Sequence, residues 1–210
     1  MTSQERAAAA VQSLDRPVGA AEALAELFSG NRRFVGGRPR YGHEIAAAAA
    51  TSGGQQPYAA VVGCIDSRVP LEAVFDQNFG SICVVRSGGT VLDQAVVGSV
   101  EFAVTELGVP LVMVLGHERC GAIAAAVAAL RGGRGADGPA AYLVEQITPA
   151  VLAAGLHRPD VHERALRRHV HDTVARLHRV DVLRAAIEGT RAVRVVGAVY
   201  DLDTGVVVQI

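Results

Sequence analysis

Residues 58–68 read YAAVVGCIDSR, and this stretch decides the fold. Its first seven residues are a short, continuously apolar run, which is typical of a strand buried on both faces of a parallel sheet. The run ends in Cys64, and Asp66 and Arg68 follow within four positions. Charged groups are costly to bury unless they are used, so a strand that ends in a thiol, a carboxylate and a guanidinium indicates a functional site.

The rest of the chain repeats this pattern of strands. Further apolar runs predict strands over residues 81–86, 109–117 and 191–201, and a hairpin turn then predicts an antiparallel strand within 206–210. Helical patterns predict helices over residues 20–34, 93–108, 120–133 and 160–179, and the Ala-rich segments 7–10 and 46–50 are predicted helices too. We therefore expect an α/β fold, with a mostly parallel central sheet of four strands, an antiparallel edge strand, flanking helices and an N-terminal helical arm.

Composition excludes several classes of protein. Half of the 210 residues are hydrophobic, yet no apolar run approaches the roughly 20 residues of a membrane span. A net charge of -1 argues against nucleic-acid binding, which needs a basic excess. The first residues lack the pattern of a signal peptide, so we expect a cytoplasmic protein. Three cysteines, an odd number, argue against a disulfide framework.

A second motif, HERC, follows the predicted strand 109–117 and supplies His117 and Cys120. Ligands of open α/β sheets bind beyond the carboxyl ends of the strands, where Cys64 also lies. Two thiolates and one imidazole are typical zinc ligands, and three protein ligands leave one position open for water. Magnesium and calcium prefer oxygen ligands, so the set favours zinc.

Asp66 has two possible roles at such a site. Its carboxylate could close the zinc site as a fourth ligand, because it lies two residues from Cys64. Alternatively, Arg68 could hold that carboxylate in a bidentate pair and leave the fourth position to water. An ordinary Asp–Arg pair that caps the turn is the third interpretation.

The segments CIDSR (64–68) and HERCG (117–121) together resemble the C-x-D-x-R and H-x-x-C motifs of the β-class carbonic anhydrases. The segments 75–93 and 195–207 are also similar to that family, and the resemblance covers roughly residues 22–210. It implies one zinc ion per subunit on Cys64, His117 and Cys120, with Asp66 and Arg68 as the catalytic dyad. The implied reaction is the reversible hydration of carbon dioxide to bicarbonate and a proton, by attack of zinc-bound hydroxide.

The resemblance also implies a homodimer or homotetramer. We accordingly divide the chain into an N-terminal helical arm for oligomerisation, residues 1–50, and a zinc-binding α/β catalytic domain, residues 51–210. In some family members the aspartate ligates zinc until the pH rises, so a ligating Asp66 predicts activity that appears only above neutrality.

The family's substrate pocket is matched only in part. Gln55 and Phe102 fall on pocket positions, and Gly121 leaves room at the turn behind Cys120, so we predict these three as substrate-binding residues. Arg86 and Tyr200 match two residues of a regulatory bicarbonate site. The family's tryptophan there is Val61 in this chain, so regulation by bicarbonate is not predicted.

Other functions remain open on the same residues. Carbonyl sulfide and carbon disulfide hydrolases resemble this family and use the same zinc ligands. A structural or sensory zinc protein would keep Asp66 bound permanently, and a thiol hydrolase would use Cys64 with His117. Five of the seven histidines lie within residues 157–178, where we favour a solvated or interface helix face over a metal cluster. Cys83 is expected to be buried and inert.

Overall fold

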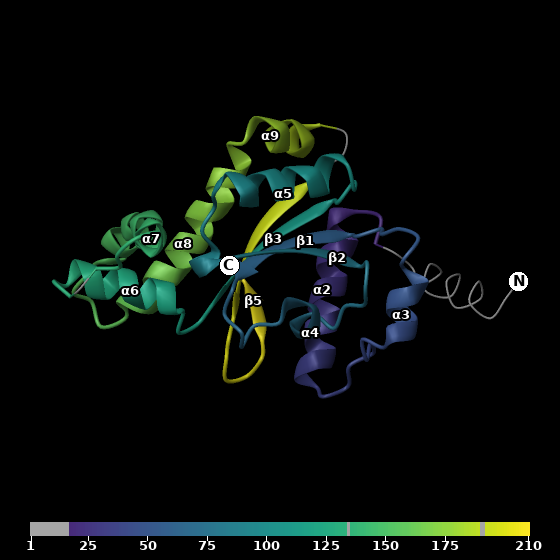
Figure 1. The fold of residues 1–210 in the computed structure, drawn as a ribbon, viewed down its shortest axis with the longest axis horizontal. Coiled ribbons are helices and arrows are strands. Elements are labelled where there is room, and N and C mark those ends of the chain that lie inside the picture. Colours follow the sequence, from purple (N-terminus) through teal and green to yellow (C-terminus); the bar gives the residue numbers. More distant parts are fainter. Residues whose placement is uncertain (1–16, 134, 190–191) are drawn as a thin grey trace, which may run out of the picture.

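The computed structural model describes residues 17–133, 135–189 and 192–210 (Figure 1). Its sheet has the strand order β2-β1-β3-β4-β5. The strands are β1 (Ala59–Cys64), β2 (Ile82–Ser87), β3 (Leu111–His117), β4 (Arg194–Tyr200) and β5 (Val207–Gln209). The first four are parallel and β5 is antiparallel to β4, which confirms the predicted sheet.

Helices surround the sheet. They are α2 (Ala20–Val35), α3 (Ile45–Ala50), α4 (Leu71–Val74), the 3-10 turn η1 (Gly88–Thr90), α5 (Gln94–Thr105), α6 (Gly121–Leu130), α7 (Ala140–Ala154), α8 (Val161–His178) and α9 (Asp181–Glu188). Every helix predicted within the described residues is present. The helices α4, α7 and α9 were not predicted, and the predicted helix over residues 7–10 lies outside the described residues.

The helices α5, α8 and α9 cover one face of the sheet (Figure 1). Asp93 caps α5, because its side chain accepts a hydrogen bond from the Val96 N–H at 2.8 Å. Beyond the helix, Gly108 adopts a positive φ of 67° and Pro110 follows, so the chain turns into β3. Val195 and Val199 of β4 point into this layer of the core.

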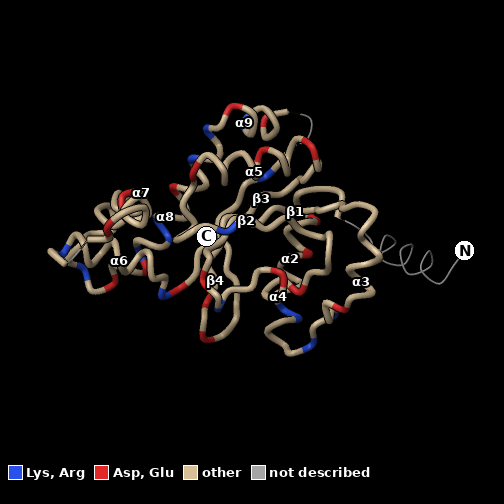
Figure 2. The backbone as a smooth tube through the Cα atoms, in the orientation of Figure 1, with Lys and Arg blue, Asp and Glu red and all other residues tan. Residues whose placement is uncertain are grey.

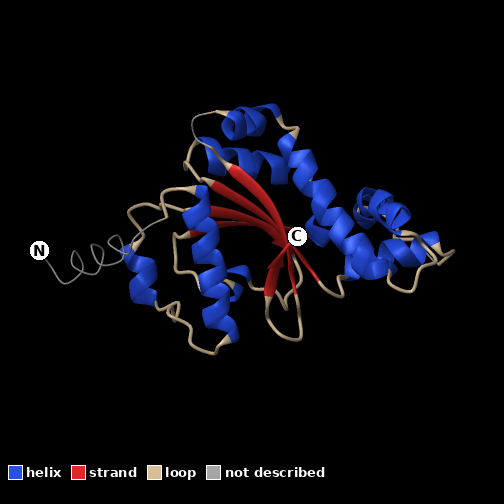
Figure 3. Ribbon diagram, turned by 180° about the vertical axis from the view of Figure 1, so that it is seen from behind, coloured by secondary structure: helices blue, strands red, loops and turns tan. Residues whose placement is uncertain are grey.

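The opposite face is covered by α2 and α4, and the view from behind shows α2 lying across the strands (Figure 3). Ala23 and Leu27 of α2 are completely buried against the sheet. The alternate residues of β4, Val196 and Ala198, point into this layer. Because β1 and β3 have helices on both faces, all their residues are buried, which explains their continuous apolar sequence. The role of residues 1–50 in oligomerisation stays a prediction.

Polar surface and charge are distributed without a dominant face. Figure 2 shows acidic and basic residues interspersed over the helices and loops, while the central strands carry few of either. No helix among the described residues has the length and apolar character needed to cross a membrane.

Candidate metal centre

Two neighbouring strands deliver the chemistry-bearing residues to one edge of the sheet. Cys64 is the last residue of β1, and His117 is the last residue of β3, which pairs directly with β1. Cys120 lies three residues further on, where it precedes α6. The two sulfurs and a ring nitrogen of His117 all lie within 4.8 Å of one another, and all three residues are buried. The structure thus brings together the three ligands predicted from the sequence.

The imidazole of His117 is oriented for metal binding. Its Nδ1 lies 2.8 Å from the Glu118 carbonyl oxygen, so Nδ1 carries the proton and donates it. Its Nε2 is buried and has no hydrogen-bond partner among the described residues. A hydrogen bond from one ring nitrogen that leaves the other free is the usual arrangement of a metal-bound histidine. The side chain fits a metal ion without rearrangement.

The two thiols interact strongly with each other. Their hydrogen bond lowers the pKa of Cys64 and raises the pKa of Cys120, because the two sulfurs share one proton. A divalent cation placed between them would replace that proton, since metals bind thiolates. Burial alone would lower the pKa of His117, but its contacts with the Cys64 sulfur, the Glu118 carbonyl and Asp66 raise it overall. This donor set of two sulfurs and one nitrogen fits zinc.

Asp66 stands beside these donors and is held by Arg68. Its Oδ1 accepts hydrogen bonds from the Arg68 backbone N–H and Nε, both at 3.0 Å, and its Oδ2 accepts one from an Arg68 terminal nitrogen at 2.7 Å. The Arg68 guanidinium holds the pKa of Asp66 well below its usual range. The Oδ2 atom also lies 3.8 Å from His117 Nε2. The structure contains the pair with Arg68, which belongs to two of the three interpretations of Asp66.

Arg86 of β2 supports the same loop, in a role that the sequence did not indicate. Its Nε donates to the Cys64 carbonyl at 2.8 Å, and a terminal nitrogen donates to the Asp66 carbonyl at 2.6 Å. These bonds hold the backbone on either side of Ile65. An arginine directly before the last residue of the adjacent strand was the available signal, because parallel register places Arg86 opposite Gly63.

The comparisons with known proteins agree with this geometry. The family model described as "Carbonic anhydrase" matches residues 59–207. Carbonic anhydrase 2 of Mycobacterium tuberculosis is 45% identical over 194 residues, which cover 90% of each chain. The chain belongs to the β-class carbonic anhydrase family. A carbonic anhydrase of Mycolicibacterium smegmatis is 43% identical over 195 residues, covering 90% of this chain and 91% of that protein.

Solved β-carbonic anhydrases share the fold. A tetrameric enzyme from Sordaria macrospora superposes with a TM-score of 0.71 at 23% identity, over 89% of this chain and 96% of that one. The Coccomyxa enzyme in complex with acetazolamide gives a TM-score of 0.70 at 24% identity, over 89% and 86% of the two chains. The family model and the curated relatives make this protein an enzyme of the carbonic anhydrase type.

Only one of the three predicted pocket residues of this carbonic anhydrase lies at the metal centre. Gly121 lies next to Cys120, and the space where a side chain would stand is open. Gln55 instead precedes the amino end of β1, whereas Cys64 closes its carboxyl end. The six residues of β1 span five rises of about 3.3 Å each, so the two ends of the strand lie roughly 16 Å apart. Phe102 lies near the end of α5, where the chain returns to the amino end of β3, and it is 55% exposed.

The remaining sequence predictions have mixed outcomes. Cys83 is only partly buried on β2, and burial raises the pKa of its thiol. No group of histidines among the described residues forms a metal cluster. The interpretation of a solvated or interface face is wrong for His169, which is 5% exposed. The only other described group of potential ligands, Glu118, Asp201 and Asp203, is less buried, and Asp203 pairs with Arg119 at 2.7 Å.

Proposed function

We propose that this enzyme catalyses the zinc-dependent, reversible hydration of carbon dioxide, in which carbon dioxide and water give bicarbonate and a proton. One observation carries the proposal: the buried Nε2 of His117 lacks a hydrogen-bond partner among the described residues, and a ring nitrogen of this histidine lies within 4.8 Å of two buried cysteine sulfurs. An orphaned buried nitrogen is costly unless it has a ligand. Family membership supports the reaction.

Cys64, His117 and Cys120 would hold one zinc ion and leave a fourth position open. A bound zinc ion would lower the pKa of a coordinated water to about 7 and thereby supply a nucleophile near neutral pH. The position of Cys120 before α6 assists its thiolate form, because the N-terminal end of a helix favours negative charge. Arg86 would keep the Cys64 carbonyl, and hence the sulfur, in place.

Asp66 would orient the attacking water. Its carboxylate is ionised throughout the neutral range, because the Arg68 guanidinium lowers its pKa. An ionised carboxylate can only accept hydrogen bonds, so Asp66 would accept one from the attacking oxygen's O–H and leave the oxygen lone pair directed at the carbon of carbon dioxide. Arg68 fixes both carboxylate oxygens, which limits rotation of the acceptor. The pairing supports an Asp66 that orients water rather than one that ligates zinc.

A second copy of the chain would complete the pocket. Gln55 and Phe102 lie at the amino end of the sheet and cannot reach a substrate at Cys64 of the same subunit. Self-association fits the exposure of large apolar side chains on the isolated subunit, such as Phe102 and Ile65, which is 64% exposed. The solved relative from Sordaria macrospora is tetrameric. We propose that these two residues contact the substrate in the site of a neighbouring subunit.

Stopped-flow hydration of carbon dioxide by the zinc-loaded enzyme, from mildly acidic to alkaline pH, tests the reaction. Rapid turnover that is lost in Asp66→Asn supports the proposal. Carbonyl sulfide and carbon disulfide are assayed side by side with carbon dioxide. Turnover of either sulfur compound without carbon dioxide hydration would transfer the function to that reaction. Bound zinc with no turnover of any of them would indicate a structural or sensory site.

Subunit mixing tests the shared pocket. Cys120→Ser removes a metal ligand, and Gln55→Ala removes a pocket residue at the other end of the sheet. If the pocket is completed by a second copy, a mixed dimer contains one site with both elements intact. Activity should therefore reappear when the two inactive variants are unfolded and refolded together with zinc. Activity that stays at the level of the separate variants would contradict a shared pocket.

A further inference from the structure

One imidazole of α8 is used inside the protein. His169 is 5% exposed, whereas His162, His171 and His178 on the same helix are exposed. Its Nε2 lies 3.0 Å from the carbonyl oxygen of Gly89, and this pair is buried. Because a carbonyl can only accept, Nε2 must carry the proton. Burial lowers the pKa of His169, which favours this neutral, donating form.

The acceptor belongs to a backbone turn in an unusual conformation. Gly89 in η1 has a φ of 63°, and the next residue, the buried Thr90, has a φ of 60°. A left-handed conformation is unfavourable for a β-branched residue such as threonine. A side chain at Gly89 would also meet Ala122 at 2.7 Å and Ile147 at 2.8 Å. Such a turn persists only where its surroundings hold it, and His169 supplies a hydrogen bond from 80 residues away.

The same turn faces the metal centre. The turn directly follows Ser87 of β2, which pairs with Cys64 in the parallel register, and the Ser87 carbonyl accepts a hydrogen bond from the Ile65 N–H at 3.1 Å. The turn packs against β1, which ends in Cys64, and against α6, which begins behind Cys120. Gly89 therefore presents its carbonyl to His169 from a turn that contacts both the strand ending in Cys64 and the helix that follows Cys120. Fixing the carbonyl constrains the torsions of that turn.

We infer that His169 is a positioning residue of the metal centre, which holds the Gly89 carbonyl and thereby fixes the turn that packs beside Cys64 and behind Cys120. The groups that surround a metal ligand set its orientation and its donor strength. This inference rests on the proposed function, because it takes Cys64 to be a zinc ligand. It assigns a role to a histidine that touches neither the ligands nor the substrate.

Spectroscopy of the Co²⁺-loaded, full-length enzyme tests the inference. The thiolate-to-cobalt charge-transfer band reports the donor strength of the sulfurs, and competition with a chelator reports zinc affinity. His169→Leu removes the hydrogen bond and largely keeps the side-chain volume. It should shift the band and weaken zinc binding by about 10-fold, the lower end of the range for groups bonded directly to a ligand, because His169 acts through the turn. His169→Gln can place an amide N–H near the position of Nε2, so it should restore most of both properties.

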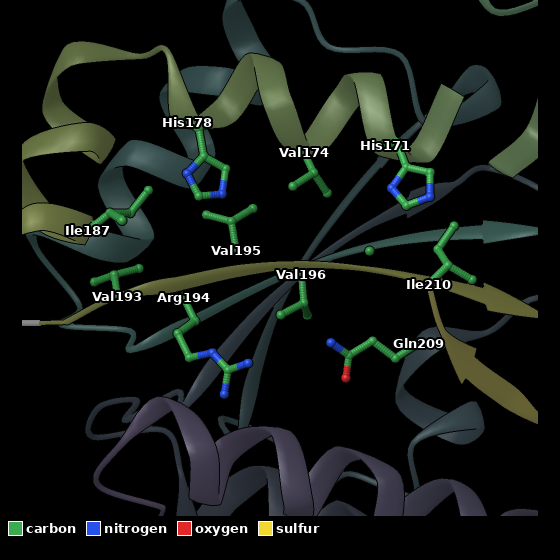
Figure 4. Close-up of a pocket in the computed structure, with 11 residues that line it drawn as sticks. His171, Val174, His178, Ile187, Val193, Arg194, Val195, Val196, Gln209 and Ile210 are labelled. Atoms are coloured by element: carbon green, nitrogen blue, oxygen red, sulfur yellow. The ribbon is translucent and has the colours of Figure 1, made fainter. Parts of the chain in front are cut away.

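A matched control comes from the same helix. His171 is exposed and lines a groove along β4 together with Val174 and Ile210 (Figure 4). His171→Leu should leave the band and the zinc affinity at wild-type values. A His169→Leu variant that unfolds at lower temperature but keeps the wild-type band and affinity would overturn the inference, because His169 would then serve packing alone.

Two further comparisons keep the result unambiguous. If His169→Leu does not fold, His169→Gln is compared with His169→Asn, whose amide is too short to reach the Gly89 carbonyl. An altered band in the asparagine variant alone supports the inference, and identical bands in both overturn it. Failure of the zinc site itself would show separately, as a wild-type enzyme that binds Co²⁺ without any thiolate band.

Discussion

Asn31 joins α2 to two distant parts of the chain, and its replacement should destabilise the enzyme strongly. The side chain is 4% exposed. Its Nδ2 donates to the Val74 carbonyl at 3.1 Å and to the Gly205 carbonyl at 2.8 Å. Its Oδ1 accepts from the Val207 N–H at 2.9 Å. One side chain therefore ties α2 to the end of α4 and to the hairpin of β5.

The expected loss follows from these three bonds. Asn31→Ala removes all three and leaves two carbonyls and one N–H without their partner in a buried region. Each net hydrogen bond contributes about 1 kcal/mol, and each unsatisfied buried group costs more, so the free energy of unfolding should fall by about 3 to 4 kcal/mol. Asn78→Ala is the control, because that side chain accepts only from the adjacent Phe79 N–H. Its cost should stay within about 0.5 kcal/mol.

Urea unfolding of the zinc-loaded enzyme measures the difference. Far-UV circular dichroism follows the transition, because the chain has no tryptophan. Protein and zinc concentrations are kept constant, since ligand binding and self-association both shift apparent stability. A loss below about 1 kcal/mol with an unchanged slope would refute the reasoning, because three buried hydrogen bonds cannot be that weak together. It would also mean that α2 behaves as a separate arm.

Three shorter predictions concern the centre and its support. Arg68→Met releases the Asp66 carboxylate, whose Oδ2 lies 3.8 Å from His117 Nε2. Turnover, measured by stopped flow, should therefore fall by at least about 10-fold, while metal analysis should show that zinc stays bound. Cys120→Ser, or prolonged chelation of the wild type, should abolish zinc binding and activity together. Burial alone would raise the pKa of Asp76, but hydrogen bonds from Arg33 and two backbone N–H groups lower it overall. The contribution of Asp76 to the free energy of unfolding is therefore present above pH 3.8, the ordinary pKa of the group, and is lost as the pH falls from there through its lowered pKa in the folded protein. Asp76→Asn should cost about 3 kcal/mol in urea unfolding at pH 7, and this cost should shrink as the pH falls below 3.8 toward the lowered pKa of Asp76.

The sheet and the three metal donors could be predicted because local sequence determines both. Continuous apolar runs report burial on two faces, and a parallel sheet gathers the carboxyl ends of its strands. Cys64 and His117 are the last residues of adjacent strands, so topology alone brings them together. The missed helices lack such signals. The helix α7 contains Pro149, and α9 has only eight residues.

Other features depended on contacts that no local pattern reports. His169 has the same sequence context as its exposed neighbours, and only the packing of α8 on the sheet buries it. Arg86 was interpreted through its resemblance to a regulatory site, yet its two hydrogen bonds reach the backbone of the adjacent loop. Both residues bind backbone carbonyls. Every residue has a backbone carbonyl, so the residue types do not show which carbonyl a side chain will bind.

The pocket residues show where prediction from one chain ends. The resemblance to the family assigns Gln55 and Phe102 to the substrate pocket. In this chain, however, both residues lie near the amino ends of the strands, whereas Cys64 lies at the carboxyl end of β1. No change of side-chain rotamer crosses roughly 16 Å, so a role in catalysis requires either a second subunit or a different pocket. The exposed apolar surface of Phe102 favours the second subunit, because burial against a partner would remove it from water. The mixing of Cys120→Ser with Gln55→Ala therefore tests two conclusions together: that the centre is catalytic, and that a single chain holds only part of it.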